Sequence, residues 1–191
     1  ALRGRGRTSP NPIVGAIVVS DGVVVGSGYH QEAGAPHAEV HALSAAGPAA
    51  KGATLFCTLE PCCHTGRTGP CVEQIVEFGI RRVVVAVEDP NPLVAGGGIS
   101  FLRDQGVQVE VGLCGREAFQ VNRDFFTFIR YNRPFVTMKI ALSKDRCTTS
   151  KEGSRAIITS TTANRHAHLL RAEVDAIGVG SGTIVTDDPL L

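Results

Sequence analysis

Three residues of the types that bind metals, far apart in the sequence, constrain the fold of this chain more than any other feature. They are His37, which stands two residues before Glu39, and the cysteines Cys62 and Cys71. One neutral imidazole and two thiolates can hold Zn²⁺ in a tetrahedral site whose fourth position stays open for water, as in catalytic zinc sites. The fold must therefore bring these side chains to one point, with Glu39 beside them as a proton carrier.

The spacing of these residues points to a particular chemistry. H-x-E followed by P-C-x-x-C is the signature of zinc-dependent base deaminases, in which the glutamate carries protons and is not a ligand. The chain has H-x-E at His37 and Glu39, and P-C at Cys62. Eight residues (63–70), instead of two, separate Cys62 from Cys71. The sequence therefore predicts a variant of this site with a longer loop between the cysteines.

Each ligand is predicted to lie at the end of a regular element. A helix is expected over residues 37–46, a strand over 53–59 leads toward Cys62, and Cys71 opens a second helix with Pro70 at its N1 position. The N-terminal end of a helix favours negative charge and lowers the pKa of a thiol, so it should favour the thiolate of Cys71. We expect two helix starts and one strand end to converge.

The remaining pattern of the first 131 residues alternates strands and helices. A β-hairpin is expected over 13–28 with Asp21-Gly22 at its turn, strands over 82–87 and 107–111, and helices over 98–106 and 117–130. The glycine cluster 96–98 matches no dinucleotide or P-loop spacing, and we interpret it as a turn. This alternation predicts an α/β fold with helices covering both faces of a sheet.

Composition excludes several classes of protein. The 191 residues are 43% hydrophobic without a long apolar run, which predicts a soluble chain with no membrane-spanning helix. The net charge of +1 provides no general attraction to nucleic acid or to a membrane. Six cysteines without a secretory signal indicate reduced thiols and a cytoplasmic location.

The pattern of residues changes near residue 131, which indicates a domain boundary, with one domain over 1–131 and another over 132–191. The second part is predicted to contain a strand over 135–142, a helix over 161–172 and a strand over 176–180. About 60 residues are few for an independent α/β domain, so we expect this part to be incomplete by itself.

Six stretches together resemble one family, the bifunctional riboflavin-biosynthesis deaminase/reductase proteins. They are residues 6–15, 28–30, 37–42 and 58–71 in the first part, and 133–139 and 170–189 in the second. The eight-residue gap between the two cysteines is that family's own pattern. The resemblance covers nearly the whole chain.

This resemblance implies a cytidine-deaminase-like three-layer α/β/α sandwich, followed by part of a dihydrofolate-reductase-like domain. It implies zinc in the first domain, NADPH in the second, and a homo-oligomer. The substrate would be diaminohydroxyphosphoribosylaminopyrimidine, a pyrimidine ribose phosphate, and the deaminated product would be reduced by NADPH. Because the second part lacks the Ser-x-Trp usual in the family and ends at Leu191, we expect this chain to deaminate but not to reduce.

The resemblance also assigns residues by position. It gives the role of zinc ligand to His37, Cys62 and Cys71, and that of proton donor to Glu39. The positions that hold the pyrimidine and its ribose phosphate correspond to Asn11, His30, His64 and Arg67. In the reductase part, Arg171 and Leu191 correspond to substrate positions, and Ala141, Thr183 and Asp187 to NADPH positions.

Three other readings compete with this one. The first pairs His37 with His41 on a metal, as in H-E-x-x-H proteases, but Glu39 stands at the wrong offset for that motif. The second is a nucleobase or tRNA adenosine deaminase, which usually keeps C-x-x-C and, if it binds RNA, a more basic surface. The third is a non-catalytic zinc module, which would need His64 or Cys63 as a fourth protein ligand.

Overall fold

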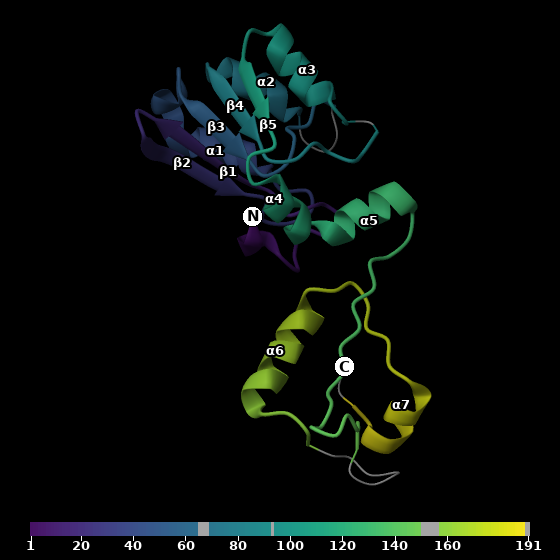
Figure 1. The fold of residues 1–191 in the computed structure, drawn as a ribbon. Coiled ribbons are helices and arrows are strands. Elements are labelled where there is room, and N and C mark those ends of the chain that lie inside the picture. Colours follow the sequence, from purple (N-terminus) through teal and green to yellow (C-terminus); the bar gives the residue numbers. More distant parts are fainter. Residues whose placement is uncertain (65–68, 93, 150–156, 190–191) are drawn as a thin grey trace. The chain divides into compact units, whose positions relative to one another are not determined.

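The computed structural model describes residues 1–64, 69–92, 94–149 and 157–189. It divides the chain into two compact units, Ala1–Phe135 and Val136–Leu191 (Figure 1). Within the described ranges, none of the helices combines the length and apolarity needed to span a bilayer.

The first unit is built on a mixed sheet with the strand order β2-β1-β3-β4-β5. The strands are β1 (Gly15–Ser20), β2 (Val23–Tyr29), β3 (Thr54–Cys57), β4 (Arg82–Val85) and β5 (Gln108–Val111). β1 pairs antiparallel with β2 and with β3, whereas β3, β4 and β5 run parallel. The predicted hairpin is confirmed: Asp21 and Gly22 form its two-residue turn, both with positive φ, as a type I′ turn requires.

The helices follow the strands in alternation. They are α1 (Ala38–Ala46), α2 (Cys71–Glu77), α3 (Gly97–Asp104), α4 (Gly115–Val121), α5 (Arg123–Tyr131), α6 (Thr161–Ala172) and α7 (Ser181–Asp187), with short 3₁₀ turns at η1 (Leu2–Gly4) and η2 (Gly47–Ala50). In Figure 1, α1, α2 and α3 lie together on one face of the sheet. The predicted α/β class is confirmed.

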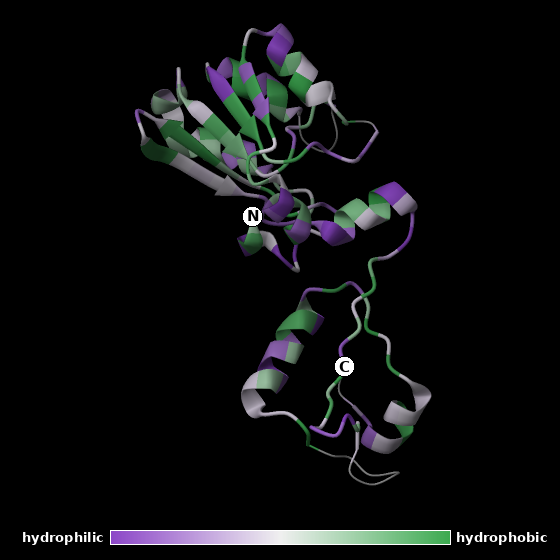
Figure 2. Ribbon diagram, in the orientation of Figure 1, coloured by the Kyte–Doolittle hydropathy of each residue, from purple (hydrophilic) through white to green (hydrophobic). Residues whose placement is uncertain are grey.

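The apolar core of the first unit lies between this helix layer and the sheet. Leu43 of α1, Ile75 of α2 and Leu102 of α3 are fully buried against Leu55 and Val83 of the central strands. Figure 2 shows the hydrophobic residues concentrated on these strands. Burial of such side chains stabilises the fold by about 1.5–3 kcal/mol each, and so fixes the helix ends that carry the site.

Close contact between α1 and β2 sets the position of the first ligand. A Cβ added at Gly28 would clash with the carbonyl oxygen of Ala38, and one added at Gly26 would clash with that of Ala42. Since the two glycines are two residues apart on one strand, they present the same face to α1. The helix therefore seats directly on the strand, with His37 at its N-terminal end.

The helix predicted over 117–130 is wrong in one respect, because the structure divides it into α4 and α5 at Asn122. The φ of Asn122 is −119°, outside the helical range. Its side chain is hydrogen-bonded to the backbone of Ile13, so a distant partner decides the break. Of the four phenylalanines in these two helices, Phe126 is fully buried and Phe128 is half-exposed.

In the second unit the helix predicted over 161–172 is confirmed as α6, capped by the Ser160 hydroxyl, which accepts from the N–H of Ala163. The strands predicted over 135–142 and 176–180 are absent from the described residues, where both segments are irregular. A strand depends on a hydrogen-bonded neighbour, and no described segment pairs with either. Their apolar residues, such as Met138, are largely exposed.

Candidate metal centre and active-site cavity

The structure brings His37, Cys62 and Cys71 together at one point, with their ligand atoms all within 4.8 Å of one another. Nδ1 of His37 lies 3.1 Å from Sγ of Cys71 and 3.4 Å from Sγ of Cys62. Zinc bonds of about 2.0 Å to nitrogen and 2.3 Å to sulfur in a tetrahedron place those atoms about 3.5 Å apart. The three side chains are therefore spaced to hold one tetrahedral ion.

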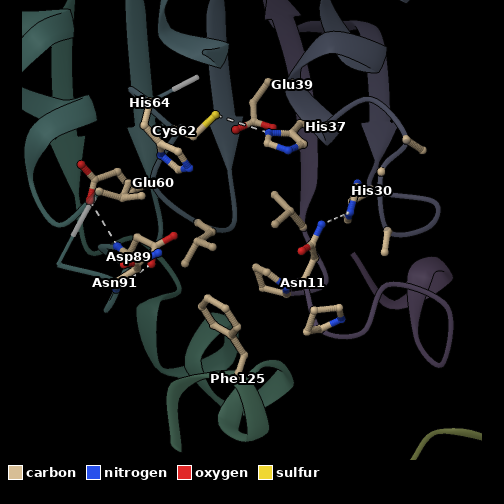
Figure 3. Close-up of a pocket in the computed structure, with 18 residues that line it drawn as sticks. Asn11, His30, His37, Glu39, Glu60, Cys62, His64, Asp89, Asn91 and Phe125 are labelled. Carbon is tan, nitrogen blue, oxygen red and sulfur yellow. Dashed lines mark hydrogen bonds between the residues drawn. The ribbon is translucent and has the colours of Figure 1, made fainter. Parts of the chain in front are cut away.

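Each of these side chains leaves the end of an element. His37 is the N-cap of α1, with extended backbone. Cys71 is the first residue of α2, and Pro70 is the N-cap of that helix, not its N1 residue as predicted. Cys62 follows β3, and its sulfur accepts the N–H of Cys71 at 3.4 Å. Two helix starts and the loop after a strand thus meet at the site. Figure 3 shows two of the three side chains, His37 and Cys62.

The two sulfurs compete for a single negative charge. The hydrogen bond from the Cys71 thiol lowers the pKa of Cys62 to about 4, and the same hydrogen bond, with burial, raises the pKa of Cys71. The adjacent Cys62 sulfur and burial therefore act against the lowering of the Cys71 pKa that was predicted from the helix end. A divalent cation reverses this balance by deprotonating coordinating thiols, so the donor set fits zinc.

Glu39 is a buried acid next to this cluster. Its side chain is 3% exposed, and its Oε2 has no hydrogen-bond partner among the described residues. Burial raises the pKa of Glu39 to about 7, so both protonation states are accessible near neutral pH. A buried polar atom without a protein partner calls for a ligand or solvent partner. Glu39 is thus suited to exchange protons with a molecule in the adjoining cavity.

A cavity of about 430 Å³ opens onto the cluster, which is the size of a small-molecule site. His37, Glu39 and Cys62 lie at its inner end (Figure 3). The other polar or aromatic residues of its lining that bear on the chemistry are Asn11, His30, His64, Glu60, Asp89, Asn91 and Phe125.

Asn11 and His30 form one wall of this cavity. Nδ1 of His30 lies 3.2 Å from the carbonyl oxygen of Pro36, which can only accept, so Nδ1 carries the proton. Nε2 must then accept from Nδ2 of Asn11, 3.1 Å away. This chain of bonds orients the Asn11 amide and leaves its Oδ1 as an acceptor for a ligand. Burial lowers the pKa of His30, which favours the neutral ring that this arrangement needs.

Asp89 and Asn91 line the cavity and were missed by the sequence analysis. Asp89 accepts the N–H of Asn91 at 2.8 Å, and burial raises its pKa to about 6. Both follow β4, just as Cys62 follows β3, and the two strands run parallel. Because the carboxyl ends of parallel neighbours share one edge, the loop after β4 could have been predicted to face the site. His64, an exposed residue, also lines the cavity.

The structure does not test the other predicted site residues. Arg67 and Leu191 fall outside the described residues. The reductase candidates belong to the second unit, where Ala141 lies in an irregular segment, Arg171 on α6, and Thr183 and Asp187 on α7. Their roles stay predictions.

None of the three alternative ligands joins the cluster formed by the described residues. That cluster contains His37 without His41, which argues against the H-E-x-x-H reading. It also omits Cys63, which packs against the core near Gly97, and His64. Among the described residues, three side chains are thus placed to hold an ion, the number of protein ligands in catalytic zinc sites.

Comparison with protein families gives two matches. Residues 1–87 match the family described as the cytidine and deoxycytidylate deaminase zinc-binding region, and residues 134–191 match the RibD C-terminal domain. The cytidine-deaminase-like fold inferred for the first part is thereby confirmed.

Individual relatives agree with these matches. The riboflavin biosynthesis protein RibD of Aquifex aeolicus is 52% identical over 191 residues, and that of Escherichia coli is 49% identical; the chain covers 54% and 52% of them. Acinetobacter baumannii RibD superposes with a TM-score of 0.92 at 43% identity, over 98% of this chain and 52% of that one. The Thermotoga maritima diaminohydroxyphosphoribosylaminopyrimidine deaminase/5-amino-6-(5-phosphoribosylamino)uracil reductase superposes with a TM-score of 0.88 at 38% identity, over 99% and 54%. The chain thus spans about half the length of the relatives it matches.

Proposed function

The chain is a RibD-like protein, with a deaminase domain and the start of the RibD C-terminal domain, and we propose that it catalyses the deamination step of riboflavin biosynthesis. The proposed substrate is diaminohydroxyphosphoribosylaminopyrimidine, and the reaction is zinc-dependent hydrolysis with release of ammonia. The observation that carries this proposal is the buried acid Glu39 beside a three-ligand cluster at the inner end of a cavity.

The metal would be held by His37, Cys62 and Cys71. Bound zinc supplies a Lewis acid that activates water for attack at neutral pH. The wall formed by Asn11 and His30 and the opposite wall formed by Asp89 and Asn91 would place a flat polar ring between them, with its amino-bearing carbon toward Glu39.

Glu39 carries the protons of the reaction in this proposal. It takes a proton from the attacking water and delivers it to the ring nitrogen, which makes the amino-bearing carbon more electrophilic. It then takes the remaining proton of the hydroxyl group added to that carbon and gives it to the amine. The C–N bond breaks, ammonia leaves as a neutral molecule, and a carbonyl group remains on the ring. A pKa of about 7 suits both directions of transfer, because neither protonation state of Glu39 is strongly favoured near neutral pH.

Substrate binding is proposed for four residues. Oδ1 of Asn11 would accept from an N–H or amino group of the pyrimidine, with His30 behind it holding the amide in that orientation. His64 lines the cavity and would meet the ribose phosphate. Arg67 would bind the phosphate through two parallel hydrogen bonds of its guanidinium group.

Residues 132–191 are proposed to be the first part of an NADPH-dependent reductase domain, following a deaminase domain over 1–131. There Ala141, Thr183 and Asp187 would contact NADPH, and Arg171 and Leu191 would contact the reductase substrate. That the chain deaminates without reducing stays a prediction. A cytoplasmic location is proposed because reducing conditions keep ligand thiols available, and all six cysteines are free in the structure. The homo-oligomer stays a prediction.

Ammonia release from the diaminopyrimidine ribose phosphate tests the proposal. We expect the zinc-loaded chain to release ammonia, and Glu39→Gln, with its zinc retained, to be slower by about 10²–10⁴-fold. Equal rates for the two proteins would remove the role given to Glu39. An adenosine-containing tRNA stem-loop serves as the competing substrate, and preferential deamination of that RNA would favour the tRNA deaminase reading instead.

A further inference from the structure

Glu60 is a buried carboxylate that no step of the proposed reaction uses. Its side chain is 3% exposed, and its oxygens accept four backbone N–H groups. Oε1 accepts from Gly98 at 3.0 Å and Ile99 at 3.1 Å, and Oε2 accepts from Gly96 at 3.0 Å and Asp89 at 3.2 Å. One side chain therefore joins the first turn of α3 to the loop that follows β4. Figure 3 shows Glu60 beside Asp89 of that loop.

The backbone next to Glu60 is also held against α3. A Cβ added at Gly98 would clash with the carbonyl oxygen of Pro61, so the two backbones are in direct contact there. Pro61 is fully buried, and the N–H of Glu60 donates to the carbonyl oxygen of Val87 at 3.0 Å. Residues 60–61, immediately before the metal ligand Cys62, are thus fixed in three ways: by the bonds of the Glu60 carboxylate, by the Glu60 N–H, and by the contact of Pro61 with Gly98.

Cys62 is held from its other side by the start of α2. The N–H of Cys71 donates to its sulfur at 3.4 Å, and the N–H of Val72 donates to its carbonyl oxygen at 3.3 Å. The ligand therefore sits between the N-terminal ends of two helices. The contact to α2 involves Cys62 itself, whereas the contact to α3 passes through Glu60.

We infer that Glu60 is a positioning residue for the metal centre. Its carboxylate anchors the backbone that aims the Cys62 sulfur, and the same carboxylate holds the N–H of Asp89, so the cavity wall is fixed relative to the ligand. Residues that act behind metal ligands change metal affinity by about 10–100-fold when replaced. A carboxylate that only capped α3 would instead change the stability of the chain and leave its affinity for zinc unaltered.

Glu60→Gln separates these two roles. Glutamine keeps the shape of the side chain but turns an NH₂ group toward backbone N–H donors. Glu88→Gln, an exposed residue in the loop after β4, is the matched control because it removes the same charge. Zinc affinity of the folded, metal-free 191-residue chain is measured by competition with a chromogenic chelator, and Co²⁺ replaces zinc for visible spectroscopy. Neither readout depends on the identity of the substrate.

We expect Glu60→Gln to bind zinc about 10–100-fold more weakly and to shift the cobalt absorption bands, while Glu88→Gln matches the parent chain. If Glu60→Gln melts earlier but binds zinc as tightly as the parent, the positioning role is overturned. Should that variant not fold, amide exchange of the parent chain decides, because coupling between the sites is reciprocal. Zinc should slow amide hydrogen exchange at Gly98 and Ile99. Exchange rates at these two residues that are equal with and without zinc would overturn the inference.

Discussion

Asn122 is hydrogen-bonded to both backbone groups of Ile13, 109 residues earlier in the chain. The N–H of Ile13 donates to Oδ1 of Asn122 at 2.8 Å, and Nδ2 of Asn122 donates to the carbonyl oxygen of Ile13 at 2.9 Å. The amide is 1% exposed and takes the place of a strand partner ahead of β1. It therefore fixes the segment that carries Asn11, and it separates α4 from α5.

Replacing Asn122 by alanine is expected to destabilise the first unit. The change leaves a buried N–H and a buried C=O of Ile13 without partners, which costs about 2 kcal/mol or more in the free energy of unfolding. Gln120→Ala, on an exposed residue of α4, should stay within about 0.5 kcal/mol of the parent chain. Urea unfolding measures both, and equal midpoints for the two variants would contradict the structural role of Asn122.

Gly28→Ala is expected to weaken zinc binding from a position outside the ligand set. The new methyl group would meet the carbonyl oxygen of Ala38, so α1 must move away from β2 and take His37 with it. Overpacking of this kind destabilises by about 1–3 kcal/mol. Ser27→Ala, whose side chain is exposed on the other face of β2, is the control. Metal content and thermal unfolding are measured together, and zinc content equal to that of Ser27→Ala would show that α1 is not seated in this way.

Asp89→Asn is expected to stabilise the chain in a pH-dependent manner. The folded pKa of Asp89 is raised from 3.8 to about 6. Burial is the largest cause, Glu60 and Cys62 also raise the pKa, and the N–H of Asn91 and the side chain of His64 lower it. Stability due to the protonated acid is therefore fully present below pH 3.8 and is lost as the pH rises through 6. Asparagine does not ionise, so the variant should melt above the parent at neutral pH.

The pH series provides the check on that prediction. The difference in melting temperature between Asp89→Asn and the parent should grow from about pH 4 to pH 6 and then stay constant. Asp104→Asn, on an exposed carboxylate, controls for the loss of one acidic group. A difference that is absent at pH 8, or largest at low pH, would mean that Asp89 is not held in a desolvated position.

What could be predicted from the sequence was governed by local chemistry or by a short motif. The Asp21-Gly22 turn needs positive φ at neighbouring residues, and α6 has its own N-cap in Ser160, so both were found correctly. The convergence of His37 and the two cysteines was expected because a metal site requires it, although no local rule places them together.

What could not be predicted depends on partners far along the chain. The break between α4 and α5 at Asn122 depends on its hydrogen bonds to Ile13. The hydrogen bonds of the Glu60 carboxylate come from backbone N–H groups 29 to 39 residues away. The pKa of Cys71 is raised most by the hydrogen bond to the neighbouring Cys62 sulfur, which the position of Cys71 at a helix end does not reveal. The apolar pattern of residues 135–142 did not make this segment a strand. A strand needs a second segment as its hydrogen-bonded partner, and the pattern of one segment does not say whether that partner is present.

The zinc content of the purified chain tests the central claim most directly. Elemental analysis after exhaustive dialysis should find about one zinc per chain in the parent and in Cys63→Ser, whose sulfur packs against the core, and almost none in Cys71→Ser. A parent chain without zinc, or a Cys71→Ser variant that keeps its zinc, would contradict the metal centre and the reaction built on it.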